Sequence, residues 1–227
     1  MAKSVRGSER RSDALTRERI VEVAIELLDA EGETGLTFRS LATRLETGHG
    51  ALQWHVANKS ELVKAAVAVV VARAVDDVDP AAPPREAIHA VALGVFDAIE
   101  AHPWIGGQLA RPPWRGTMLR LFERVGRQVR ALGVPAGAQF TATSALLIYI
   151  IGAGGQEATN SQSPVALGDR QDVLDRLSAE WSELDPDEYA FTRSMAEQLR
   201  VHDDRAEFLA GVDLLLAGMS GRGASPR

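Results

Sequence analysis

The sequence predicts an all-α protein, with a small N-terminal helix-turn-helix unit followed by a larger helical domain. From Leu15 onward apolar residues recur at the three- and four-residue spacing of amphipathic helices, and no stretch shows the alternation of a half-buried strand. The segment 79–84 (DPAAPP) is the clearest interruption of this pattern and indicates a domain boundary. We expect four segments: a flexible basic arm over 1–14, a first domain over 15–79, a second domain over 80–219 and a flexible tail over 220–227.

The first two helices are marked by their start and stop signals. Thr16 suits the N-cap of a helix whose apolar residues recur at i, i+4, i+7 and i+8 from Ile20, and Gly32 is expected to end it. Thr37 suits the N-cap of a second helix, over 38–45. Two short helices in this order are the beginning of a helix-turn-helix arrangement.

A turn over 46–48 leads to a third, short helix at about 48–56. Asn58 and Glu61 then form a capping-box-like pair at the start of a fourth helix, over 59–75. Several valines in this segment would favour a strand, but the start signal and the length favour a helix.

The second domain is predicted to be helical throughout. We expect seven helices separated by turns rich in Pro, Gly or Asp, at 85–101, 104–111, 114–132, 135–160, 169–184, 187–200 and 203–218.

Composition excludes several classes of protein. The chain has 227 residues, a net charge of −6 and 45% apolar residues, which is ordinary globular usage. It contains no cysteine, which removes disulfides and thiolate metal sites. The longest uninterrupted run of apolar residues and glycine, 145–155, is too short to span a bilayer, and the polar N-terminus lacks a signal-peptide core. We therefore expect a cytoplasmic protein with no membrane partner.

No motif of a common enzyme class is present. The sequence contains no GxSxG, HExxH or GxxxxGK[ST], and no GxGxxG that follows a strand. The glycines of 152–155 lie inside an apolar helical run and are interpreted as a close helix-packing site. The five histidines are not grouped with one another or with carboxylates. We expect neither catalysis, nor a cofactor, nor a metal site.

The third helix carries the pattern of a DNA-reading helix. Leu52 and Val56 share one side, which leaves His49, Gly50, Gln53 and Trp54 on the opposite arc. The small residues Gly50 and Ala51 allow a close approach to base edges, while His49 and Gln53 can form hydrogen bonds to bases or phosphate. A two-turn helix of this kind suits insertion of its N-terminal end into the major groove. The alternative is that Trp54 only packs against a neighbouring helix.

Two helix N-termini are candidate phosphate sites. Arg39 lies in the first turn of the second helix, which has no carboxylate, and Lys59 opens the fourth helix. Such contacts would position the protein, while the third helix would read sequence. Each of these residues could equally belong to an ordinary solvated surface, and it is their combined spacing that favours DNA binding.

Residues 15–75 resemble the DNA-binding domain of the TetR family of bacterial transcriptional regulators. The matching stretches are LTRERIVEVAIELLDAEG, LTFRSLATRL, GALQWHV and NKSELVKA, in the order and spacing of the family. The resemblance implies a homodimer on a near-palindromic DNA operator and a C-terminal domain that binds a small molecule and releases DNA. It assigns Arg39, His49, Gly50 and Ala51 to contacts with bases or adjacent backbone, and Gln53, His55 and Lys59 to phosphates.

Two residues depart from the family's pattern. Glu46 occupies a turn position where the family usually has Gly, so a residue with a side chain must adopt a left-handed conformation. Gln53 replaces a frequent Tyr. Glu46 also places a negative charge close to the DNA.

The second domain offers candidate dimerisation and ligand-binding residues. Two helical stripes, one over 141–156 and one over 208–219, are interpreted as dimerisation faces, with packing inside the monomer as the alternative. Six arginines of 111–130, against Glu123 alone, are interpreted as a solvated stripe, with the binding of an anionic effector as a less favoured alternative. The expected effector pocket contains aromatic, methionine and polar residues: Phe96, Trp104, Trp114, Met118, Phe122, Tyr149 and Gln156.

These observations predict a ligand-responsive transcriptional regulator, with repression as the favoured mode, that binds its operator as a homodimer and is released by a small-molecule effector. The alternative is a helical small-molecule-binding or protein-interaction module whose DNA-binding unit is vestigial. Glu46 is the residue that most favours this alternative.

Overall fold

The structure is a computed structural model that describes residues 15–76, 78–109, 116–161 and 170–221. All regular elements in these ranges are helices, as the sequence predicted. Within the chain two compact units separate, Met1–Arg73 and Ala74–Arg227, and each is described by itself. This boundary falls inside a helix, a few residues before the Pro-rich segment at 79–84. The expected arm over 1–14 and most of the expected tail over 220–227 lie outside the described residues.

The N-terminal unit begins with α2 (Arg17–Gly35). The Thr16 side chain accepts a hydrogen bond from the backbone N–H of Arg19 at 3.1 Å, which confirms the predicted N-cap. Gly32 has φ 67° and ψ −171°, so the regular helix breaks there as expected, and one further turn follows to Gly35. A left-handed φ has little steric cost at glycine, which explains why the break occurs at this residue.

Three further helices follow: α3 (Phe38–Arg44), α4 (His49–Gln53) and α5 (Lys59–Asp76). The sequence predicted the limits of α3 and α5 closely, but α4 is shorter than expected because Trp54 and His55 lie in a turn. α3 has the predicted N-cap and a complete capping box, in which Thr37 and Ser40 exchange side-chain-to-backbone hydrogen bonds of 2.9 and 3.0 Å.

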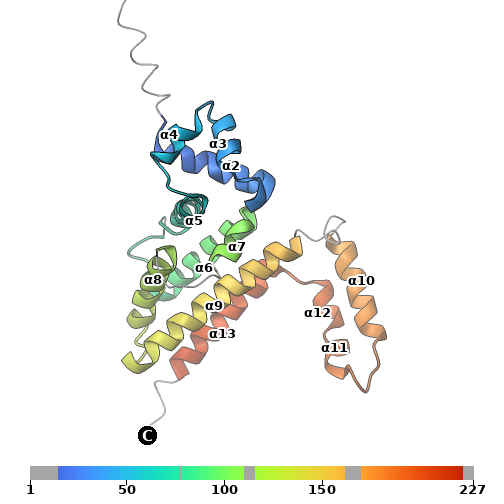
Figure 1. The fold of residues 1–227 in the computed structure, drawn as a ribbon. Coiled ribbons are helices and arrows are strands. Elements are labelled where there is room, and N and C mark those ends of the chain that lie inside the picture. The colour runs from blue at the N-terminus through green and yellow to red at the C-terminus, as the bar shows by residue number, and fades with distance from the viewer. Residues whose placement is uncertain (1–14, 77, 110–115, 162–169, 222–227) are drawn as a thin grey trace, which may run out of the picture. The chain divides into compact units, whose positions relative to one another are not determined.

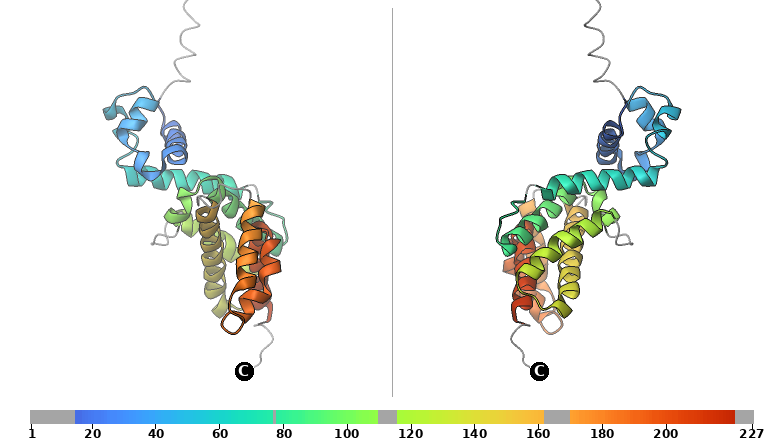
Figure 2. Two further views of the ribbon diagram at one scale, coloured as in Figure 1. Left: turned by 90° about the vertical axis from the view of Figure 1, so that its right-hand side faces the viewer. Right: turned by 90° about the vertical axis from the view of Figure 1, so that its left-hand side faces the viewer.

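The C-terminal unit contains the remaining helices (Figures 1 and 2). The segment 187–200 was predicted as one helix, and that prediction is wrong: it forms two, because the backbone at Met195 (φ −96°, ψ −4°) departs from helical geometry. The helices of the C-terminal unit are α6 (Pro84–Ala101), α7 (Trp104–Leu109), α8 (Thr117–Ala131), α9 (Ala136–Ser161), α10 (Arg170–Glu183), α11 (Ala190–Ser194), α12 (Ala196–Arg200) and α13 (Asp204–Gly221).

Helix α9 is the central element of this unit and packs against α6, α7, α8 and α13. Leu146, Leu147 and Ile150 are at most 1% exposed and form its buried face. By length and composition the segment Ala136–Thr159 would suffice to cross a membrane, although its longest uninterrupted apolar run is short. Its packing against these four helices accounts for the apolar composition of the buried side.

Ion pairs connect α6 to α13 at the surface of this core. Asp213 accepts hydrogen bonds from Arg85 at 2.8 Å and from the ring of His89 at 2.9 Å, and Arg205 pairs with Asp97. These groups are partly exposed, so their contribution to stability is small compared with that of the apolar core.

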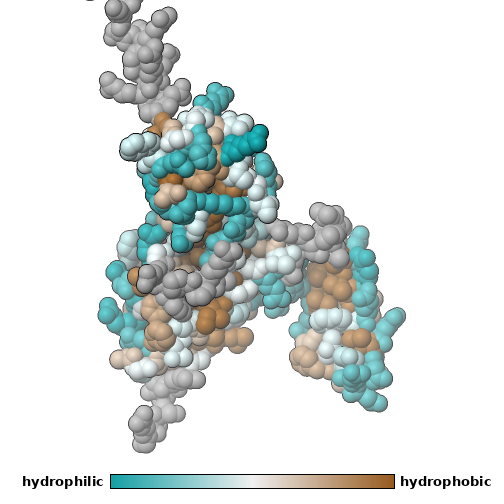
Figure 3. Space-filling view, viewed as in Figure 1, coloured by the Kyte–Doolittle hydropathy of each residue, from teal (hydrophilic) through white to brown (hydrophobic). Residues whose placement is uncertain are grey.

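Helices α10, α11 and α12 pack mainly on one another. Arg170 joins the start of α10 to the start of α13 through an ion pair with Asp204 at 2.5 Å, and it donates to the carbonyl oxygen of His202 at 3.1 Å. Figure 3 shows hydrophobic side chains gathered on the surface of this segment. Two apolar side chains of this segment are largely exposed, Phe191 at 75% and Val201 at 72%.

The last turn of α5 approaches α6 very closely at Gly94. A Cβ atom at this position would lie 2.1 Å from the backbone carbonyl oxygen of Ala74. A backbone atom cannot yield as a flexible side chain does, so the close approach of the two helices requires glycine.

We expect Gly94→Ala to lower the free energy of unfolding by about 1–3 kcal/mol, because the added methyl group overpacks the α5–α6 contact. Gly107→Ala is the matched control, since a Cβ there meets nothing within 4 Å and alanine favours the helix. Urea denaturation of both variants measures the difference. A Gly94→Ala protein as stable as Gly107→Ala would contradict the close approach.

Candidate nucleic-acid interface and ligand site

Helix α4 is held in place by two buried side chains. Leu52 is 0% exposed and Val56 2% exposed, which confirms that both point inward. The rest of the helix surface lies in solvent: His49, Gly50, Ala51 and Gln53 are exposed, and Trp54 is 91% exposed. The structure therefore excludes the alternative in which Trp54 packs inside the N-terminal unit. A helix of five residues has no independent stability, so the burial of Leu52 and Val56 is what presents the outer arc.

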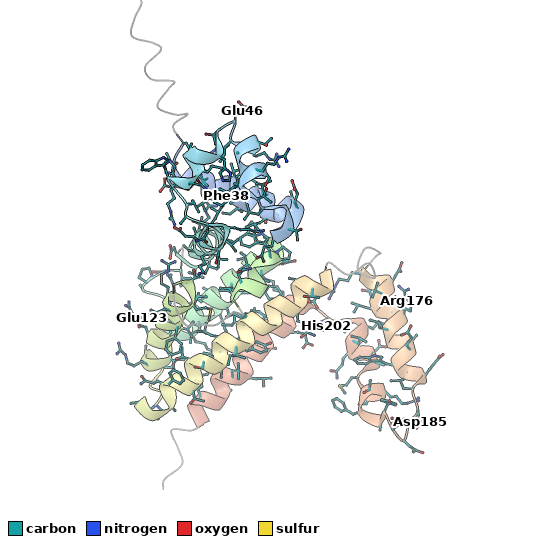
Figure 4. The ribbon with its side chains drawn as sticks, in the orientation of Figure 1. Phe38, Glu46, Glu123, Arg176, Asp185 and His202 are labelled. Atoms are coloured by element: carbon teal, nitrogen blue, oxygen red, sulfur yellow. The ribbon has the colours of Figure 1, made fainter. Side chains whose placement is uncertain are left out.

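The turn before α4 contains Glu46, whose φ of 49° is in the left-handed region. Figure 4 shows Glu46 at the tip of the loop between α3 and α4. This conformation costs a residue with a Cβ atom about 1–2 kcal/mol. The turn is closed by backbone hydrogen bonds from Glu46 to Thr43 at 3.3 Å and from Thr47 to Ala42 at 3.0 Å. The strained residue expected from the sequence is thus present, and the turn still forms.

His49 is held between two neighbouring side chains. Its ring lies 5.3 Å from the ring of Phe38, centroid to centroid, at an interplanar angle of 55°. Its Nε2 atom is 3.3 Å from Nε2 of Gln53, one turn further along α4. Phe38 is not among the residues predicted from the sequence, because nothing in the sequence connects an aromatic residue at the first position of α3 to α4. The structure shows that it orients an exposed histidine.

The two candidate phosphate-binding cations differ in their surroundings. Arg39 is exposed in the first turn of α3. Lys59 is half-buried, and its Nζ atom donates a hydrogen bond to the backbone carbonyl oxygen of Glu33 at the end of α2. An ammonium group has three donors, so this bond leaves two for another acceptor. His55, four residues before Lys59 in the sequence, is also half-buried.

The start of α5 is capped in a way that also connects it to α2. Asn58 Oδ1 accepts from the Glu61 backbone N–H at 2.9 Å, which is the predicted cap. The Glu61 carboxylate reaches back to the backbone N–H of Ala57 at 3.1 Å and accepts from Arg17 at 3.2 Å. The Ala57 N–H and the Arg17 guanidinium lower the pKa of Glu61 below its ordinary value of 4.5. The carboxylate is therefore ionised when the cap is formed.

We expect acid to destabilise the N-terminal unit through Glu61. Because its pKa is lower in the folded chain, its stabilising contribution is complete above the unfolded value, near 4.5, and is lost as the pH falls through the folded value. The stability of Glu61→Gln, measured by urea denaturation between pH 7 and pH 3, should therefore depend less on pH than that of the parent protein. Parallel curves for the two proteins would show that Glu61 has no such role.

In the C-terminal unit three aromatic side chains from α6, α9 and α13 form one cluster. The ring of Phe208 lies 4.6 Å from that of Phe96 and is stacked on Tyr149 at 5.7 Å. The Tyr149 hydroxyl donates to the carbonyl oxygen of Phe208 at 3.1 Å. Burial, together with the nearby charge of Glu207, raises the pKa of Tyr149, so its hydroxyl stays protonated. Gly211 makes room for it, because a Cβ there would lie 1.9 Å from the hydroxyl oxygen.

The described residues do not bring all the predicted effector residues to this cluster. Phe122 pairs with Phe140 at 5.6 Å and lines a different groove, between α8 and α9. Trp104 is half-buried, with its ring 6.1 Å from that of His102, and Gln156 is exposed. Met118 is half-buried at the start of α8, and Trp114 lies outside the described residues.

The stripe over 208–219 was predicted as a dimerisation face, with packing inside the monomer as the alternative, and part of it packs inside the monomer. Phe208, Val212 and Leu216 are at most 3% exposed and belong to the core of the unit. Leu214 points the other way and is 76% exposed. Leu215 and Met219 of the same stripe are half-buried, so both sides of α13 carry apolar residues that the monomer does not fully cover. The α9 stripe is more open, with Thr141, Gly152 and Gln156 exposed.

Comparison with known protein families agrees with this architecture. Residues 80–222 match the family described as "Tetracyclin repressor-like, C-terminal domain". The chain belongs to the TetR family of transcriptional regulators. The matched region begins at the Pro-rich segment and extends over almost the whole C-terminal unit, where the sequence alone showed little resemblance.

Individual TetR-family proteins are similar over most of the chain. A TetR transcriptional regulator of known structure from Streptomyces coelicolor is 52% identical, with a TM-score of 0.84 over 92% of this chain and 99% of that one. An HTH-type transcriptional regulator from Saccharopolyspora erythraea is 29% identical over 73% of this chain and 70% of its own length.

A shorter match is to a tetracycline repressor. The class D tetracycline repressor from Escherichia coli is 43% identical over 68 residues, which are 30% of this chain and 31% of the repressor. The relatives that match this chain are thus regulators, and the motifs of the common enzyme classes are absent from its sequence.

Proposed function

We propose that this TetR-family protein is a ligand-responsive repressor that binds a near-palindromic operator as a homodimer and is released by a small-molecule effector. The observation that carries the proposal is the outer arc of α4, which is exposed to solvent while Leu52 and Val56 hold the helix from beneath. A short, braced helix with small residues at its start matches the shape requirement of the major groove.

The residues around α4 divide into two roles. Arg39, His49, Gly50 and Ala51 would meet bases or the adjacent backbone, and Phe38 would fix the direction of the His49 ring. The other exposed or half-buried residues would contact phosphates, which position the protein and supply affinity: Gln53, Trp54, His55 and Lys59. A BioQ structure that contains its double-stranded DNA operator, 29% identical to this chain with a TM-score of 0.56, supports DNA as the partner.

The exposed sides of α9 and α13 support the homodimer. Ile148 on α9 is 67% exposed and Leu214 on α13 is 76% exposed, on two helices that pack against each other within the chain. In the most apolar window of α9 only 33% of the residues are buried. Pairing these faces with those of a second copy would form a four-helix bundle and remove the exposed apolar surface from water.

The aromatic cluster of Phe96, Tyr149 and Phe208 is the proposed effector region. It combines apolar rings with one polar hydroxyl group, which is the chemistry of a small-molecule site. Helix α5 supplies the connection, because it is continuous from the N-terminal unit to Ala74, which contacts α6 at Gly94. An effector that moves α6 would displace α5. The two α4 helices of the dimer would then no longer match operator half-sites that lie about 34 Å, or a multiple of that distance, apart.

We expect Arg39→Ala and Lys59→Ala each to weaken binding to the DNA upstream of the gene by about 1–3 kcal/mol. Lys59→Ala should also reduce the dependence of binding on salt, because one phosphate contact fewer releases fewer counterions. Electrophoretic shift at several salt concentrations measures both effects. Lys64→Ala is the control, since it removes the same charge from an exposed position of α5.

The same experiment separates the proposal from a module with a vestigial DNA-binding unit. Such a module would show no association with DNA that depends on salt. Equal affinity of the parent protein, Arg39→Ala, Lys59→Ala and Lys64→Ala would also reject the proposed contacts.

We expect Ile148→Glu and Leu214→Glu to convert the dimer to a monomer, because each buries a charge in the proposed interface. Sedimentation equilibrium measures the mass, against 24.4 kDa for one chain. Leu119→Glu, at a 56% exposed position of α8, should leave the dimer intact. A parent protein that sediments as a monomer, or variants that still dimerise, would show that these helices are not the interface.

A further inference from the structure

A groove of about 350 Å³ runs between α8 and α9, away from the aromatic cluster around Tyr149. From α8 it is lined by Phe122, Glu123, Gly126, Arg127 and Arg130, and from α9 by Ala136, Gln139, Phe140 and Thr143. The volume corresponds to the lower end of small-molecule pockets, and is suited to one or two fused rings.

The walls of the groove are aromatic. Phe122 and Phe140 face each other with ring centroids 5.6 Å apart at an angle of 51°. Phe140 is 68% exposed, which leaves most of its ring in water. A flat apolar molecule placed against both rings would cover this surface, and offset or tilted stacking is the arrangement that aromatic rings prefer.

The polar side chains at the floor of the groove already form hydrogen bonds within the protein. Thr143 is 1% exposed and its hydroxyl donates to the carbonyl oxygen of Gln139 at 2.8 Å. The side-chain amide nitrogen of Gln139 donates to the Val134 carbonyl oxygen at 2.9 Å. At Gly126 the two helices are close, since a Cβ there would lie 3.5 Å from the Thr143 hydroxyl oxygen. The floor therefore suits the apolar part of a ligand.

The rim of the groove is positively charged. Arg120, Glu123, Arg127 and Arg130 follow one another at i, i+3, i+7 and i+10 and share one face of α8. Glu123 pairs with Nε of Arg127 at 2.7 Å, which leaves the two outer nitrogens of that guanidinium. Among the described residues no carboxylate pairs with Arg130, which is exposed. Three cations against one anion on this face contrast with the net charge of −6 of the whole chain.

We propose that the α8–α9 groove is a second ligand site, which binds a small aromatic carboxylate. The ring lies against the exposed surface of Phe122 and Phe140, and the carboxylate is held by Arg130 and the outer nitrogens of Arg127. A guanidinium group matches a carboxylate in a bidentate geometry, so the charge and the aromatic walls select the two ends of the same molecule. This site is additional to the proposed effector region and does not depend on DNA binding.

Isothermal titration calorimetry with 2-naphthoate tests the proposal on the full chain. Arg130→Gln and Phe140→Ala are each expected to raise the dissociation constant about tenfold or more, equivalent to about 1.4 kcal/mol. Both positions are exposed, so both variants should fold, and sedimentation checks that they keep the parent's oligomeric state. Arg176→Gln, on the exposed side of α10 in Figure 4, is the matched control and should bind as the parent does.

The neutral analogue 2-naphthamide separates charge recognition from simple apolar binding. We expect it to bind at least tenfold more weakly than 2-naphthoate to the parent protein, and equally weakly to Arg130→Gln. Equal affinity of acid and amide for the parent would overturn the proposal.

Three other results would also overturn it. The first is no binding of 2-naphthoate to the parent protein. The second is unchanged binding in both Arg130→Gln and Phe140→Ala. The third is binding that survives in both of these variants and is lost in Tyr149→Phe, which would place the ligand in the effector region instead. None of these results would alter the operator experiment, so the two proposals fail separately.

Discussion

The arrangement of the N-terminal unit depends on the burial of one face of a helix too short to exist alone. Helix α4 has five residues, and the packing of Leu52 and Val56 beneath it fixes its position. This constraint explains why the opposite arc can be composed of glycine, alanine and polar residues, which contribute nothing to the core. It also explains how a left-handed Glu46 is tolerated, because the buried contacts on either side of the turn offset a strain of about 1–2 kcal/mol.

The elements around α4 are connected by side chains that serve the fold and the proposed interface together. Lys59 bonds to the end of α2, and Glu61 joins the start of α5 to Arg17 on α2. The same helix α5 continues to Ala74, where only a glycine on α6 permits the observed approach.

Helix α9 has three different surfaces. One is buried against α6, α7, α8 and α13, one is apolar and exposed at Ile148, and one lines the groove with Phe122 of α8. This division explains its apolar composition better than a membrane does. It also shows why the sequence predicted one pocket for residues that belong to two proposed ligand sites. Phe122 and Tyr149 are both on helices of the same core, but they face different sides of it.

The sequence by itself determined the local features of this protein. The caps at Thr16, Thr37 and Asn58, the break at Gly32 and the inward face of α4 follow from short-range chemistry, and all are present. The tertiary structure alone decided which of several apolar faces are covered. It buried Phe208 and exposed Leu214 on one helix, separated Phe122 from Phe96 and Tyr149, and set Phe38 against His49. Spacing along a chain gives the side of a helix on which a residue lies, but the partner of that side is set by packing between segments far apart in sequence.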